Sequence, residues 1–142
     1  MQEEVIAGMN EWCVEQHGKS GLTERVRAST VSLADAEAAV LAFVSTHCAA
    51  GAAILAGNSV HADLAFIKRY MPRLAAHLHY RLVDVSSVRE LAKRWYPNAS
   101  RRAPRKACAH TAKADILESI EELRFLKKAV FKDTGGGGSR RS

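Results

Sequence analysis

The chain has 142 residues, of which 47% are apolar and 25% charged, so its length and composition suit one globular domain. Its formal net charge of +6 favours an anionic partner, nucleic acid first. Four arginines lie in an expected loop or tail, and setting them aside leaves only +2 (Arg101, Arg102, Arg140 and Arg141). No apolar run approaches the roughly 18 residues of a membrane-spanning helix, so no membrane partner is expected.

Apolar periodicity predicts helices over residues 2–15, 22–28, about 35–48, about 62–71, 85–95 and 111–131. The string HGKSG at 17–21 is expected to end the first helix, and Pro72 the fourth. Ser32 and Asp35 resemble the start of a capping arrangement, with Ala36, Val40, Phe43 and Val44 on one face of the helix that follows. The last two helices are expected to bury Val85, Val88, Leu91, Ala92 and Trp95, and Ile116, Ile120, Leu123 and Val130.

Two short apolar segments, Ala53–Gly57 and Tyr80–Asp84, are the strand candidates. Residues 96–109 indicate a long loop, and residues 133–142, DTGGGGSRRS, a flexible Gly/Ser/Arg tail beyond a domain of residues 1–132. Three cysteines without a C-x-x-C pair (Cys13, Cys48 and Cys108) predict free thiols in a reducing, intracellular compartment.

The stretch GNSVHADLAFIKRYM, residues 57–71, follows the first strand candidate and places Asp63 in the first turn of a helix. Ligands of α/β sheets bind beyond the carboxyl ends of strands, where Ser59 and Asp63 are expected. The alternative is that Asp63 only complements the positive end of its helix.

His110 and Asp115 open the last helix, about 7.5 Å apart along its axis. With Asp63 they form a plausible centre for metal-assisted phosphodiester hydrolysis. Their spacing alone is equally typical of a histidine at a helix start beside a surface acid.

Four pieces occur together in this order: WCVEQHGKSGLTERV, AGNSVHADLAFIKRYMP, HLHYRLVDVSSVRELAKRWYP and the H-x4-D of His110 and Asp115. From about Met9 to about Lys132 the chain resembles oligoribonuclease, a 3′-to-5′ exonuclease of the DEDDh group, with its eukaryotic branch expected to be nearest. The resemblance implies an α/β, ribonuclease-H-like exonuclease fold, with the two strand candidates as parallel neighbours joined by a crossover through the helix after Asp63.

The resemblance also implies a site in which four carboxylates hold two Mg²⁺ or Mn²⁺ ions. Asp63 and Asp115 match two of these metal ligands, and His110 matches the general base. The substrate-binding positions are Trp12, His17, a phosphate cap of Ser59, Arg81, Ser86 and Ser87, and the wedge residue Tyr80. Ala114 stands where the family usually has an acid, and Lys113 where an apolar residue is usual.

In the family, three strands precede the region matched here, and the first carries an Asp-x-Glu pair; no segment of this chain matches them. The expectation is therefore an N-terminally truncated domain, with helices around a partial sheet and little or no activity on its own. The two main interpretations are an exoribonuclease that degrades dinucleotides to mononucleotides, and an impaired form that keeps only nucleotide-binding and dimerisation surfaces. A small basic helical module that binds RNA is disfavoured, because the basic residues do not form one periodic face. Short RNA, a homodimer joined through Tyr80 and Arg81, and a cytoplasmic or mitochondrial location complete what the resemblance implies.

Overall fold

The computed structural model describes residues 2–104 and 112–132. Within these residues the chain forms helices and two short strands: α1 (Gln2–Ala7), α2 (Glu11–Lys19), α3 (Leu22–Ala28), α4 (Leu33–His47), β1 (Leu55–Gly57), α5 (His61–Tyr70), α6 (Pro72–His77), β2 (Leu82–Asp84), α7 (Val85–Trp95), α8 (Pro97–Ser100) and α9 (Ala112–Val130).

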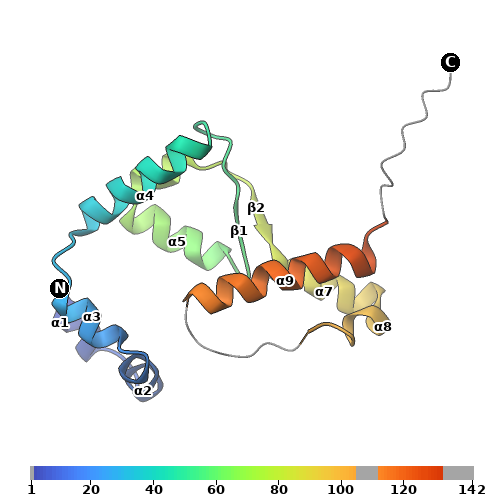
Figure 1. Cartoon of the computed structure of the whole chain (residues 1–142), viewed down its shortest axis with the longest axis horizontal. Coiled ribbons are helices and arrows are strands. Elements are labelled where there is room, and N and C mark those ends of the chain that lie inside the picture. Colours follow the sequence, from blue (N-terminus) through green and yellow to red (C-terminus); the bar gives the residue numbers. More distant parts are fainter. Residues whose placement is uncertain (1, 105–111, 133–142) are drawn as a thin grey trace.

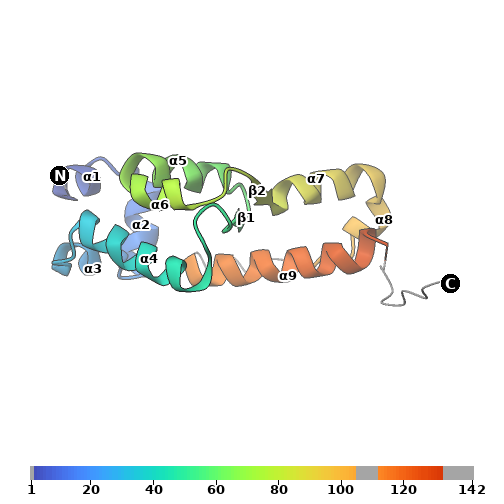
Figure 2. The same cartoon turned by 90° about the horizontal axis from the view of Figure 1, so that it is seen from above.

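The elements form an elongated arrangement with the two strands near its middle (Figure 1). Helices α1, α2 and α3 lie together at one end, where the guanidinium of Arg27 donates to the carboxylate of Glu3, with the nearer nitrogen and oxygen 3.1 Å apart. Helices α7 and α9 lie side by side on the other side of the strands (Figure 2). Because α9 also contacts β1, the last helix is held against the first strand.

Strands β1 and β2 pair in parallel, with Leu55 opposite Leu82 and Gly57 opposite Asp84. This confirms the predicted neighbours, although each strand is shorter than expected. The backbone contact continues beyond the ladder through two hydrogen bonds, from the amide of His79 to the carbonyl of Ala53 and from the amide of Gly51 to the carbonyl of His77 (both 2.8 Å). The register brings both strands to an end at the same edge, so the turns after Gly57 and Asp84 emerge together.

The buried core centres on the contact between α7 and α9. Val85, Ala92 and Leu126 are each only 2% exposed, with Val88 and Leu123 packed against them. The prediction that Leu91, Trp95, Ile116 and Ile120 point inward is wrong, since their exposed fractions are 43%, 66%, 61% and 42%. Residues 85, 88 and 92 define the face of α7 that meets α9, and Leu91 falls beside that face. Trp95 follows Val88 by seven positions and shares its stripe, but it is the last residue of the helix and is exposed there.

The first predicted helix is also corrected. Residues 2–15 do not form one helix, because Gly8 lies in the break that ends α1 and Asn10 starts α2 by accepting a hydrogen bond from the amide of Cys13 (2.8 Å). Helix α2 then runs through His17 and Gly18 to Lys19, so the HGKSG string ends the helix later than expected.

Helix α4 has the predicted cap, since the hydroxyl of Ser32 accepts from the amide of Asp35 (3.1 Å). Its buried side chain is Glu37, 7% exposed, whereas Val40 and Phe43 on the predicted apolar face are 41% and 67% exposed. One oxygen of Glu37 accepts from the amides of Arg73 (2.7 Å) and Leu74 (3.2 Å). The Glu37 carboxylate of α4 therefore caps the start of α6, a helix that was not predicted from the sequence.

Pro72 ends α5 as predicted, but it also opens α6 at a position where a missing amide hydrogen costs nothing. In the same way Pro97 opens α8, which interrupts the predicted loop. The predicted tail, residues 133–142, lies outside the described residues. In the described parts of the chain no single helix has the length and apolar character to cross a membrane; α3 and α4, bent by 104°, pass that test only as a pair and by length and composition alone.

Candidate phosphate-binding and metal site

The turns that follow the two strands form a polar cluster. The amide of Ser59 donates to the hydroxyl of Ser86 (2.7 Å) and to the carboxylate of Asp84 (3.0 Å). The two serine hydroxyls lie 3.2 Å apart. Two of the predicted phosphate-binding residues, 27 positions apart in the sequence, are thus brought together at the carboxyl edge of the sheet.

Ser59 has a backbone φ of 54°, in the left-handed region that residues other than glycine adopt rarely. Such a conformation costs roughly 1 kcal/mol or more. The two hydrogen bonds of its amide offset that cost, and the Ser59 hydroxyl lies within reach of the Ser86 hydroxyl. The backbone strain therefore lies within the predicted phosphate cap.

Asp84 underlies the cluster and starts helix α7, where its carboxylate accepts from the amide of Ser86 (2.9 Å). Its other oxygen lies 3.5 Å from Nδ1 of His61. Partial burial acts to raise the pKa of Asp84, but hydrogen bonding from Ser59, Ser86 and His61 outweighs it, and the net pKa lies below the ordinary value of 3.8. Asp84 is therefore ionised at neutral pH.

Asn58, which precedes Ser59, joins the cluster to α9. Its Oδ1 accepts from the hydroxyl of Ser86 (3.2 Å), while its Nδ2 donates to the hydroxyl of Ser119 (2.8 Å) and to Oε2 of Glu122 (3.2 Å). Sequence reasoning missed Asn58, Asp84, Ser119 and Glu122. An aspartate directly before a predicted helix was a usable capping signal for Asp84, but a buried glutamate such as Glu122 has no local sequence signature.

The predicted metal ligands lie in the first turns of two helices. Asp63 belongs to α5 and Asp115 to α9, and both are exposed. His110, the predicted base, lies outside the described residues. Within residues 2–104 and 112–132, no three His, Cys, Asp or Glu side chains are grouped so as to hold a metal ion. Since each Mg²⁺ takes about six oxygen ligands, Asp63 and Asp115 supply only part of the ligands that a two-ion centre needs.

Other predicted substrate contacts lie on different elements. Tyr80, 77% exposed, precedes β2; its ring stacks on that of His79 with centroids 4.5 Å apart, and the guanidinium of Arg81 lies 5.3 Å from its centroid. Ser87 is exposed next to Ser86 in the first turn of α7. Tyr80 and Arg81 thus lie just before β2 and Ser87 just after Ser86, and all three are exposed to solvent.

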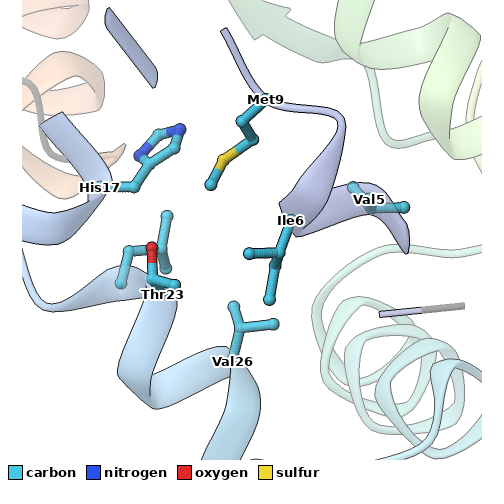
Figure 3. Close-up of a pocket in the computed structure, with 7 residues that line it drawn as sticks. Val5, Ile6, Met9, His17, Thr23 and Val26 are labelled. Atoms are coloured by element: carbon cyan, nitrogen blue, oxygen red, sulfur yellow. The ribbon is translucent and has the colours of Figure 1, made fainter. Parts of the chain in front are cut away.

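His17 lies apart from the cluster, in an apolar cavity of about 270 Å³ between α1, α2 and α3 (Figure 3). The cavity is lined by Val5, Ile6, Met9, His17, Leu22, Thr23 and Val26. Trp12, also on α2, is 56% exposed. None of the three helices supplies a residue to the hydrogen bonds described above for the Ser59 cluster, so the structure does not bring these two predicted nucleotide contacts to it.

Comparison with known proteins identifies the family of this chain. The RNase_T family model, described as Exonuclease, matches residues 1–123. A probable oligoribonuclease of Dictyostelium discoideum is 52% identical over 92% of this chain and 67% of its own length. The mitochondrial oligoribonuclease of Bos taurus is 51% identical over 92% of this chain and 55% of its own length. An oligoribonuclease of Corynebacterium efficiens is 54% identical over 91% of this chain and 59% of its own length.

The chain thus spans between about half and two thirds of the length of these curated relatives. Eukaryotic and bacterial relatives match at similar identity, so identity does not favour one branch. The predicted α/β class is confirmed, as a mostly helical chain around a small parallel sheet. The family match over residues 1–123 and the identity of about half to each relative establish that the chain belongs to the exonuclease family and, within it, to the oligoribonucleases.

Proposed function

We propose that the protein carrying this sequence is a 3′-to-5′ exoribonuclease that degrades very short RNA, dinucleotides above all, to mononucleotides. The observation that carries the proposal is the meeting of Ser59 and Ser86 beyond the paired ends of β1 and β2. Asp63 follows four residues after Ser59 on α5, so a phosphate-binding turn and a metal-binding carboxylate share one short segment. Family membership supplies the reaction class.

In this proposal the hydroxyls of Ser59, Ser86 and Ser87 and the guanidinium of Arg81 bind the 5′ phosphate of the substrate. Hydroxyls and arginine are suited to an oxyanion because they donate several directed hydrogen bonds, and arginine adds a permanent charge. The carboxylate of Asp84 opposes the phosphate charge, and this makes the positive charge of Arg81 more important. A cap that binds a terminal phosphate leaves little length of chain between it and the cleaved bond, which favours dinucleotides.

Asp63 and Asp115 are proposed as ligands of Mg²⁺ or Mn²⁺ ions, and His110 as the base that takes a proton from the attacking water. Bound divalent ions would supply a nucleophilic hydroxide and neutralise the leaving oxygen. Trp12, His17 and Tyr80 are proposed to contact nucleobases, Tyr80 from the second subunit of a homodimer. The exposure of Tyr80 and its stacking with His79 and Arg81 support that role, since an exposed aromatic group is available to a base or a partner.

A second candidate is a catalytically impaired form that binds dinucleotides and dimerises. The observation that favours it is that the described residues contain no group of three metal-binding side chains. Both candidates place the protein in the cytoplasm or the mitochondrion, and one of its relatives is named as mitochondrial.

The test gives the 142-residue chain a labelled, 5′-phosphorylated diribonucleotide with Mn²⁺ and follows both binding and mononucleotide release. The first candidate requires release that Asp115→Asn abolishes while the circular dichroism spectrum stays unchanged. Glu121→Gln is the matched control, since Glu121 is exposed on the same helix in an ion pair with Arg124 (2.6 Å). Binding without release selects the second candidate, and the absence of binding rejects both.

A further inference from the structure

The side chain of Asn58 stands between the phosphate-binding turn and helix α9. Its carbonyl oxygen faces Ser86 on α7, and its amide nitrogen faces Ser119 and Glu122 on α9. All three hydrogen bonds are 2.8–3.2 Å long and part-buried. One side chain therefore links three segments of the chain: the turn after β1, the start of α7 and the middle of α9.

The hydrogen bonds around Asn58 run in one direction. The amide of Ser59 donates to the Ser86 hydroxyl, and that hydroxyl donates to Oδ1 of Asn58. On the other side Nδ2 of Asn58 donates to the Ser119 hydroxyl, and this hydroxyl donates to the backbone carbonyl of Asp115 (2.7 Å). An unbroken donor sequence thus runs from Ser59 in the cap to the backbone of Asp115, and bonds arranged in this way polarise one another.

Glu122 makes the amide nitrogen of Asn58 indispensable. The glutamate is 8% exposed, and its second oxygen accepts from Nη1 of Arg89 at 3.3 Å. A carboxylate at position 58 would match the shape of asparagine and still accept from Ser86, but it would face the Glu122 carboxylate without a hydrogen to donate. Like charges at such a distance inside a part-buried site repel strongly.

We propose that Asn58 is a positioning residue that fixes α9, the helix carrying Asp115, relative to the hydroxyls of Ser59 and Ser86. The inference rests on the proposed function, in which those hydroxyls hold the substrate phosphate and Asp115 acts at the cleaved bond. Asn58 itself contacts neither the phosphate nor the reacting atoms. It sets the separation between the two groups, and a shift of α9 of even an ångström lowers turnover more than it lowers binding.

The experiment compares Asn58→Asp with the charge-conserving exchange Asn58→Asp/Glu122→Gln in the full chain. The single variant keeps the link to Ser86 and removes the N–H donor that reaches Ser119 and Glu122 on α9. The double variant restores a donor and an acceptor with their positions exchanged. Asn98→Asp is the matched control, because Asn98 is exposed on α8 and its Oδ1 accepts from the nearby Arg101 (3.4 Å).

The first measurement is hydrogen exchange of backbone amides, which needs no catalytic activity. Asn58→Asp is expected to raise exchange about tenfold in the part of α9 around Ser119 while α2 and α3 stay unchanged, and the double variant is expected to reverse most of that rise. Equal exchange in wild type and Asn58→Asp, an equal rise in every helix, or no reversal in the double variant would overturn the proposal.

The second measurement separates turnover from binding of the 5′-phosphorylated diribonucleotide. Asn58→Asp is expected to lower kcat about tenfold or more with KM within about threefold of wild type, because the cap keeps its link to Ser86. A rise in KM with kcat unchanged would overturn the positioning role. If the wild-type chain neither binds nor cleaves, the proposed function fails, while the exchange measurement still decides whether Asn58 holds α9.

Discussion

Replacing Glu37 should destabilise the fold more than replacing Asp35, the other acidic residue of α4. Glu37 is only 7% exposed, and one of its carboxylate oxygens accepts from the amides of Arg73 and Leu74, at 2.7 and 3.2 Å. Helix α6 has no side-chain cap of its own, so these two amides depend on a carboxylate 36 and 37 positions earlier in the chain. Glu37→Ala leaves one buried and one part-buried donor without this acceptor.

The expected loss is about 3 kcal/mol, since hydrogen bonds to a charged group contribute roughly 1.5–3 kcal/mol each and unsatisfied buried donors cost a similar amount. Glu37→Gln keeps an acceptor oxygen and removes only the charge at the positive end of α6, so it should cost about 1 kcal/mol. The measurement is urea unfolding followed by circular dichroism. Glu121→Ala is the control, because its exposed ion pair contributes less than about 1 kcal/mol. If Glu37→Ala and Glu121→Ala unfold at the same urea concentration, Glu37 does not cap α6.

Three further predictions concern the cluster and its surroundings. Because the pKa of Asp84 is lowered in the folded state, its carboxylate stabilises the fold above pH 3.8, and this stabilisation is lost as the pH falls through the lower folded pKa. Asp84→Asn should therefore lower the free energy of unfolding by about 1 kcal/mol at pH 7 and weaken its dependence on pH in the acid range. Unfolding measured over a series of acid pH values checks both effects. Ser59→Ala should unfold about 1 kcal/mol more easily than Ser59→Gly, because alanine retains the left-handed strain that glycine relieves; equal urea midpoints would contradict this. Tyr80→Ala should leave the urea midpoint unchanged, since the ring is 77% exposed, but should weaken self-association in analytical ultracentrifugation and dinucleotide binding.

Much of the local structure could be predicted because local chemistry decides it. Proline stops α5, the Ser32 hydroxyl starts α4, and the apolar segments before Gly57 and Asp84 form parallel strands. The same local signals predicted that Ser59 lies beyond the end of a strand, whereas the role of Ser86 beside it was implied by the family resemblance. Those features depend on residues within about one helical turn of the element they control.

The failures came where tertiary packing selects among several plausible faces. Periodicity alone places Leu91 and Trp95 on the buried side of α7, but the residues of α7 that pack into the core are Val85, Val88 and Ala92. The buried acids Glu37 and Glu122 were missed for a related reason. Their partners are backbone amides and an asparagine far away in the sequence, and nothing beside them in the chain indicates such a partner.

The link from Asn58 to α9 also has a consequence for the order of folding. Its two contacts join residues that are 61 and 64 positions apart, whereas the cap of α4 and the turns of α2 and α3 close over three or four positions. Long closures lose more chain entropy and form after short ones, so the helices and the β1–β2 pair should assemble before α9 docks. Substitutions at Asn58 should then speed unfolding and leave the folding rate almost unchanged, because its contacts form after the rate-limiting step.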